Sequence, residues 1–143
     1  MPILNYTTKI DSYKTITEIQ KILAKAGASK MIIDNDNKGN PVALTFCIEW
    51  KGVNCAFCLP CNFDGVLRAM TKDKSVSRSS CTEEQALRVG WRILKDWIEA
   101  QLAIVNAELA TMAEIFLPYV ITKDGQTLYN KIEAYKGLFL LTN

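Results

Sequence analysis

A long amphipathic segment, residues 82–105, constrains the fold of this 143-residue chain more than any other feature. Thr82 and Gln85 fit a capping box, and the two glutamates between them lie where the helix dipole favours anions. One apolar stripe recurs at helical spacing: Leu87, Trp91, Leu94, Ile98, Leu102 and Val105. A second set widens the apolar arc: Ile93, Trp97, Ala100 and Ile104. The segment predicts one long helix that is buried on most sides, by its own domain or also by a partner subunit.

The interior of this helix limits what it can pack against. Gly90 costs about 1 kcal/mol relative to alanine in a helix, so its presence predicts close approach by another backbone. Charged residues interrupt every apolar run of the length that a bilayer requires, which argues against a membrane-spanning segment.

The remainder of the chain divides into a strand-rich part and a helical part. Strands are predicted over four stretches: residues 3–10, 30–34, 42–50 and 53–59. The turn at Lys51 and Gly52 joins the last two strands as a hairpin. Further helices are predicted over residues 15–27, 63–72, 111–117 and 127–137. The apolar tail after Gly137 is expected to dock on the protein.

These elements predict an α+β fold in a single domain, residues 1–143. Residues 1–62 form a sheet-rich half of order β-α-β-β-β, and residues 63–143 form a helical half. We expect an antiparallel sheet packed against that helical half, with the long helix at its centre.

Composition excludes several classes of enzyme. The chain contains no histidine, which removes Ser-His and Cys-His nucleophile pairs, the commonest general base and the commonest metal ligand. Five cysteines, an odd number, with no secretion signal predict reduced thiols in a cytosol. No catalytic constellation is visible, so we expect a binding protein rather than an enzyme, without a cofactor.

Charge is unevenly distributed although the net charge is only +2. Residues 68–95 carry seven basic side chains against three acidic ones, and residues 96–143 carry three against six. Six basic residues are candidates for contact with phosphate groups: Arg68, Lys72, Lys74, Arg78, Arg88 and Arg92. For Arg88 and Arg92, ion pairs with Glu84 and Asp96 at i,i+4 spacing are the slightly favoured alternative. For the other four, ligand binding and a solvated surface are equally supported.

Two patterns suggest metal sites, and each has a stronger structural explanation. Cys55, Cys58 and Cys61 form C-x2-C-x2-C, a spacing used for metal or iron–sulfur ligation. Their odd separation in a strand would point Cys55 and Cys58 to opposite faces, so buried apolar cysteines are favoured. The stretch from Asp34 to Gly39 resembles a calcium loop, but Thr45 stands where the twelfth-position glutamate belongs, so a hairpin turn is favoured.

The run RVGWRILKDWIEAQLAI, residues 88–104, resembles a family of small proteins from tailed-phage and prophage genomes. The similarity extends to Y-T-T-K at residues 6–9, the helix at 19–28, Leu59-Pro60, E-x-F-L-P-Y at 114–119 and T-L-Y at 127–129. It spans nearly the whole chain and implies a phage origin and a location in the host cytosol. The family carries no assigned activity, so no catalytic residue is transferred, and the three-cysteine pattern is not part of it.

Small phage accessory proteins without enzyme motifs commonly act by binding, which leaves two main hypotheses. The first is an inhibitor of host defence, anti-CRISPR-like, that docks on an effector protein or sequesters a nucleotide ligand. The second is a nucleic-acid-binding accessory protein of phage replication or recombination, for which DNA or RNA is the partner. A cysteine-based or metal-dependent hydrolase ranks third because it requires an activated thiol or a bound metal. We expect the first, as a cytoplasmic homo-oligomer assembled through the central helix.

Overall fold

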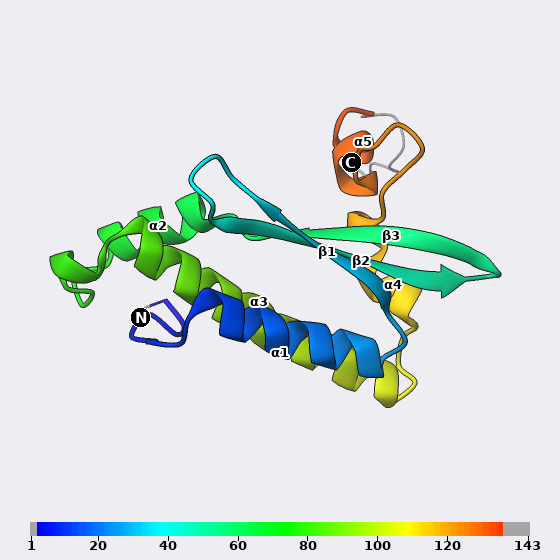
Figure 1. The fold of residues 1–143 in the computed structure, drawn as a ribbon, viewed down its shortest axis with the longest axis horizontal. Coiled ribbons are helices and arrows are strands. Elements are labelled where there is room, and N and C mark those ends of the chain that lie inside the picture. Colours follow the sequence, from blue (N-terminus) through cyan, green and yellow to red (C-terminus); the bar gives the residue numbers. More distant parts are fainter. Residues whose placement is uncertain (1–2, 136–143) are drawn as a thin grey trace, which may run out of the picture.

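The long helix predicted from the sequence is helix α3, Glu83–Asn106, in a computed structural model that describes residues 3–135 (Figure 1). The elements before it are α1 (Ser12–Lys25), β1 (Ser29–Asn35), β2 (Pro41–Trp50), β3 (Val53–Pro60), α2 (Phe63–Lys72) and η1 (Arg78–Ser80). Those after it are α4 (Met112–Phe116), η2 (Leu117–Tyr119) and α5 (Leu128–Glu133). In this part of the chain, no helix has both the length and the apolar character needed to cross a membrane.

Helix α3 begins where its capping signal predicts. The side chain of Thr82 accepts a hydrogen bond from the amide of Gln85 at 3.1 Å, which satisfies one of the free donors of the first turn. The stripe identified in the sequence faces the core, and Trp91 is only 1% exposed. Its indole Nε1 donates to the carbonyl of Pro41 at 3.1 Å, so the one polar atom of this buried ring has a partner.

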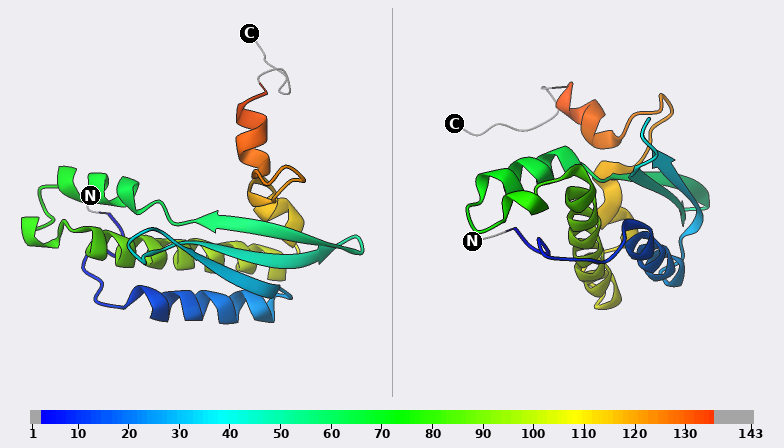
Figure 2. Two further views of the ribbon diagram at one scale, coloured as in Figure 1. Left: turned by 45° about the horizontal axis from the view of Figure 1, so that its top comes forward. Right: turned by 60° about the vertical axis from the view of Figure 1, so that its left-hand side comes forward.

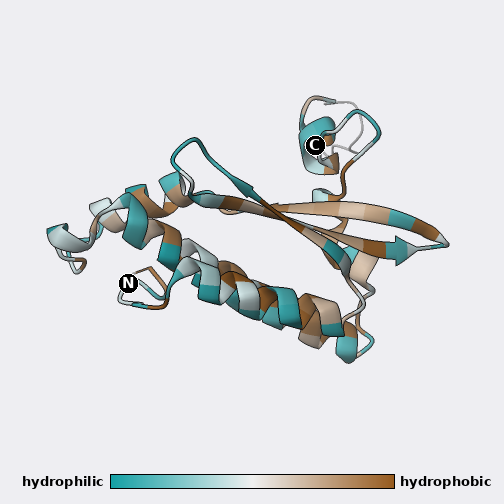
Figure 3. Cartoon of the chain, in the orientation of Figure 1, coloured by the Kyte–Doolittle hydropathy of each residue, from teal (hydrophilic) through white to brown (hydrophobic). Residues whose placement is uncertain are grey.

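The sheet has three antiparallel strands in the order β1-β2-β3. Helices α1 and α3 lie side by side against the same side of this sheet (Figure 2). Alternate residues of β2, including Leu44 and Phe46, point into that core opposite Leu59 and Phe57 of β3. Phe116 of α4 closes the core, with its ring centroid 5.2 Å from that of Phe46 in an edge-to-face contact. Figure 3 shows apolar residues concentrated along β2 and β3 and on the inner parts of the helices.

One core is built from both halves of the chain. Its buried residues come from α1, β2, β3, α3 and α4. A second, smaller cluster joins α2 to the first half of α3 and contains Met70, Val76, Ala86 and Val89. The α+β class, the antiparallel sheet and the central helix are therefore confirmed.

The strand predicted over residues 3–10 is wrong, and the β-α-β-β-β half is an α-β-β-β half. The segment turns at Asn5, whose φ of 64° is left-handed. It then runs along α3, where the side-chain amide Nε2 of Gln85 donates to the carbonyls of Tyr6 and Thr8 at 3.1 and 2.8 Å. A side chain of α3 thus provides the hydrogen bonds that a neighbouring strand would have provided.

The close approach predicted at Gly90 is present, but side chains make it rather than a backbone. A Cβ atom at this position would lie 2.9 Å from Sγ of Cys61 and 3.5 Å from Cγ2 of Val66. Glycine therefore lets α2 and the end of β3 pack directly on α3.

The chain after α3 covers the free edge of β3 and then leaves the body of the protein. Thr111 and Glu114 form the predicted capping box of α4. Val120 bridges to Phe57, and the amide of Ile121 donates to the carbonyl of Ala56 at 2.8 Å. Helix α5 then stands away from the layers (Figures 1 and 2). The helix ends at Glu133, four residues before the end predicted at Gly137. The predicted docking of the tail lies outside the described residues.

Candidate functional site

The six basic residues singled out in the sequence separate into two groups. Arg88 and Arg92, on α3, are engaged by acidic side chains and are only 25% and 17% exposed. Arg88 pairs with Glu84 at 2.9 Å, as the i,i+4 spacing predicts. Arg92 pairs with Glu18 of α1 at 2.7 Å, not with the predicted Asp96. Arg92 therefore links α3 to α1, whereas the pair of Arg88 lies within α3, and both guanidinium groups are engaged by carboxylates of the chain itself.

The other four basic residues form a surface that we call the basic surface: Arg68, Lys72, Lys74 and Arg78. All four are exposed, and none forms an ion pair with another residue of the described chain. The first two lie one helical turn apart on α2, Lys74 follows in the loop after α2, and Arg78 begins η1. Their charges are therefore accessible to an anion from solvent.

The loop that carries this surface is folded on itself. The carboxylate of Asp73 accepts hydrogen bonds from the hydroxyl and the amide of Ser75, at 2.6 and 2.9 Å. Val76 is 5% exposed and packs into the smaller core. The hydroxyls of Ser77 and Ser80 lie 2.9 Å apart across the η1 turn. An apolar anchor and three local hydrogen bonds thus fix where the cations of the loop lie.

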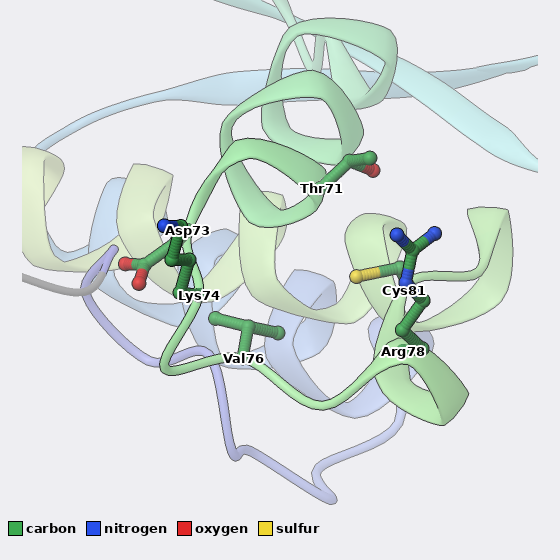
Figure 4. Close-up of a pocket in the computed structure, with 6 residues that line it drawn as sticks. All are labelled: Thr71, Asp73, Lys74, Val76, Arg78 and Cys81. Carbon is green, nitrogen blue, oxygen red and sulfur yellow. The ribbon is translucent and has the colours of Figure 1, made fainter.

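A cavity of about 410 Å³ opens between this loop and the end of α2. It is lined by Thr71, Asp73, Lys74, Val76, Arg78 and Cys81 (Figure 4). The figure places Val76 in the middle, Asp73 and Lys74 on one side, and Arg78 beside Cys81 on the other. The hydroxyl of Thr71 donates to the carbonyl of Leu67 at 2.8 Å, so it offers a ligand only its lone pairs.

Electrostatics divide the cavity into two unlike sides. The hydrogen bonds from the Ser75 side chain and amide lower the pKa of Asp73, which stays ionised at neutral pH. This carboxylate lies beside Lys74 and opposes an anion there. Asp73 is the one acidic residue that lines the cavity, and Arg78 forms no ion pair with the described residues. A compact anionic group would therefore bind on the Arg78 side, where donors face it without a like charge.

The cysteine pattern does not assemble a metal site in the described part of the chain. Cys55 packs against the main core, whereas Cys58, three residues on, lies opposite Thr45 on the other face of the sheet. Cys61 is buried beside Gly90, and burial raises its pKa to about 12, which keeps the thiol protonated. Between residues 3 and 135, no group of three metal-ligating side chains comes together.

The stretch that resembles a calcium loop forms a hairpin turn. Asp36 accepts hydrogen bonds from the amides of Asn40 and Lys38, both at 2.9 Å, and these bonds lower its pKa. The carboxylate thus stabilises the turn between β1 and β2, as the hairpin interpretation predicts.

Sequence patterns did not identify the neutral lining of the cavity. Thr71, Val76 and Cys81 meet there only because α2, the loop and η1 converge. One local signal existed: Val76 is the lone apolar residue in a serine-rich loop and marks where that loop is anchored. Comparison with protein-family models, with curated proteins and with solved structures finds no match to this chain.

Proposed function

We propose that this chain is a phage-encoded protein that acts by binding, and that the basic surface docks on a phosphate-bearing partner. One observation carries the proposal: four exposed cations form no ion pair with the described residues, and two of them, Lys74 and Arg78, line a cavity of about 410 Å³. The contrast with Arg88 and Arg92 supports it, because acidic side chains pair with those two cations, whereas none between residues 3 and 135 pairs with the other four.

The chemistry of the four residues fits phosphate better than carboxylate peptides or neutral ligands. Lysine and arginine supply the contacts that dominate phosphate recognition, and an arginine fork binds two phosphate oxygens at once. Arg68 and Lys72 extend the positive charge along α2 away from the cavity, so a ligand with several phosphates would contact all four.

The resemblance to phage proteins gives this binding a biological setting. We infer an inhibitor of host defence, anti-CRISPR-like, in the host cytosol. It would cover the place where an effector holds nucleic acid, or would sequester a nucleotide that activates the effector. Neither role needs a catalytic residue.

Charge reversal tests the proposal. The quadruple variant R68E/K72E/K74E/R78E is compared with K14E/K21E/K25E/K30E, which makes the same change in net charge at exposed lysines of α1 and β1. We expect loss of defence inhibition, and of binding to the effector or its ligand, in the first variant and retention in the second. Inhibition that survives in the first variant refutes the role of the basic surface.

A nucleic-acid accessory protein is the second candidate, and the succession of exposed cations from α2 through the following loop to η1 favours it. Such a protein binds DNA or RNA in isolation. With four phosphate contacts on a duplex, the logarithm of affinity should fall with the logarithm of salt at a slope of about −3.6. Tight, salt-sensitive binding by the purified protein would select this candidate, whereas effector binding without nucleic acid would select the inhibitor.

Self-association through α3 is a separate proposal. Ile93, Leu94, Trp97 and Tyr119 line an apolar groove of about 250 Å³ together with the end of β3. A second copy that packs along α3 would remove this surface from water. Sedimentation at high micromolar concentration tests it: a strict monomer contradicts the proposal.

A further inference from the structure

Strand β1 lies at an edge of the sheet, and no further strand between residues 3 and 135 pairs with its outer side. The strand order is β1-β2-β3, and only the free side of β3 is bridged, by Val120 and Ile121. Backbone amides and carbonyls on the outer side of β1 are therefore available to another strand. An edge of this kind binds a further extended chain unless charges or bulges prevent it.

The regular part of this edge is short and carries an exposed apolar side chain at its middle. Bulges interrupt the pairing with β2 between Ser29 and Met31 and again after Asp34. Ile32 lies between them and is 60% exposed, on the face of the sheet away from the core. Its neighbours Met31 and Ile33 point to the core side but are only partly buried. Apolar surface thus remains on both faces of this edge.

The charged residues on either side of Ile32 have opposite signs. Lys30 precedes it by two residues, and Asp34 follows it by two. Both side chains are exposed, and neither forms an ion pair between residues 3 and 135. The edge therefore reads as a cation, three apolar residues and an anion, a pattern that is complementary to its own reverse.

Antiparallel pairing of two copies about a two-fold axis at Ile32 would match these groups. Ile32 opposes itself, Lys30 opposes Asp34 twice, and Met31 opposes Ile33 on the core side. Opposed residues of antiparallel strands have Cβ atoms about 4.5–5.5 Å apart, and opposite charges placed there stabilise the pair. Lys30 adopts a φ of 47° at the bulge, and its long flexible side chain spans the displacement of the backbone.

Other registers match these groups less well. A slip that keeps each side chain on its own face moves the two-fold axis to Met31 or Ile33. Ile32 would then oppose Lys30 in the first case or Asp34 in the second, so a charged group would lie against an apolar one. The charge pattern therefore selects the register centred on Ile32.

We propose that the chain dimerises by antiparallel pairing of β1 with β1 of a second copy, which joins the two sheets into one of six strands, three from each copy. A second copy is the occupant because the edge is complementary to itself, as a closed two-fold interface requires. Tyr13 of α1 is 48% exposed and donates to Asn35 at 3.3 Å, so it extends the apolar surface beside this edge. The interface uses neither the α3 groove nor the basic surface.

A charge swap tests the pairing in the full-length protein. Lys30→Asp and Asp34→Lys each place like charges opposite one another twice, so each should raise the dissociation constant of the dimer by about tenfold or more. The double variant K30D/D34K restores opposite charges and should return the constant to within about threefold of the native value. Aspartate tolerates the positive φ of position 30. Lys123→Asp, in the exposed turn before α5, is the matched control and should leave the constant unchanged.

Sedimentation equilibrium over a range of about 5 to 200 μM measures this constant, because mass action fills the dimer as concentration rises. A native protein that stays monomeric throughout would show that the bulges and charges block the edge, and would overturn the proposal. So would a dimer that the single variants do not weaken, or one that the double variant does not restore.

A cysteine at the two-fold axis tests the register directly. Ile32→Cys brings two thiols to a Cβ separation close to that of a disulfide, so mild oxidation should give a covalent dimer. Glu49→Cys, exposed on the same face near the tip of the β2–β3 hairpin, should give no more dimer than the native chain with its own cysteines. Equal cross-linking of the two variants would overturn the register. Every variant retains the basic surface, so either result leaves the proposed function to its own test.

Discussion

Replacing Gly90 with alanine has two opposing effects on the stability of the protein: it raises helix propensity, and it adds a methyl group to a packed core. Alanine stabilises the interior of a helix by about 1 kcal/mol relative to glycine. Against this, the new Cβ would lie 2.9 Å from Sγ of Cys61, a side chain only 4% exposed, and 3.5 Å from Cγ2 of Val66. Forcing an extra methyl group into a packed core costs about 1–3 kcal/mol. Because overpacking exceeds propensity, we expect the free energy of unfolding to fall by about 1 kcal/mol.

Urea unfolding followed by tryptophan fluorescence measures this change, with the m-value as a check that the unfolded state is unaltered. Cys61→Ala removes the sulfur that the new methyl group meets. In the Cys61→Ala background, Gly90→Ala should therefore become neutral or stabilising by up to about 1 kcal/mol. Ala100→Gly, at an exposed position of the same helix, changes helix propensity without changing core packing. It should lower the free energy of unfolding by about 1 kcal/mol.

The sign of the change in the free energy of unfolding shows whether overpacking or helix propensity dominates at position 90. If Gly90→Ala in the otherwise native chain raises the free energy of unfolding by the amount that Ala100→Gly lowers it, packing against Cys61 is not limiting. Equal effects of Gly90→Ala with and without the Cys61 sulfur would refute the contact itself.

Three further predictions follow from buried or paired groups. Burial raises the pKa of Cys61 from 9.0 to about 12, so the thiol of the unfolded chain deprotonates at a lower pH than the thiol of the folded protein. Between pH 9 and 12 the free energy of unfolding should therefore fall with pH. Its slope should be steeper than that of Cys61→Ala by up to about 1.4 kcal/mol per pH unit. Gln85→Ala leaves two carbonyls of the N-terminal segment without a donor; it should cost about 1–3 kcal/mol in urea unfolding and speed exchange of amides 3–10. Arg92→Ala breaks the half-buried pair with Glu18 and should lower the free energy of unfolding by about 1 kcal/mol. Loss of the exposed i,i+4 pair of Arg88 should lower it by only a few tenths of a kcal/mol. Double-mutant cycles on the two pairs measure these differences.

Features that depend on neighbouring residues could be predicted from the sequence. Helix α2 has the predicted bounds, because Asn62 caps its start and the polar loop after residue 72 provides no continuation. The β2–β3 hairpin follows from alternation on both sides of a turn at Lys51 and Gly52, which both adopt positive φ. The side-chain caps of Thr82, Thr111 and Thr127 are local in the same sense.

Features that depend on residues distant in the sequence could not be predicted from the sequence. Residues 3–10 have the composition of a strand, but contacts with distant residues place the segment along α3 instead. Gln85 donates to its carbonyls, and Asp96 accepts a hydrogen bond from Asn5. The partner of Arg92 was predicted at i,i+4, but Glu18 lies closer once α1 packs on α3. In both cases tertiary contact overrides a correct local tendency.

The candidate site also combines features that could be predicted from neighbouring residues with features that depend on distant ones. The run of basic residues is visible in the sequence, and so are the ion pairs that could neutralise it. Which cations are free depends on how α1 and α3 meet: Glu18 reaches Arg92 and Lys95, whereas no acidic side chain in the described chain pairs with Lys74 or Arg78. The cavity beside them is beyond sequence patterns because three separate elements line it.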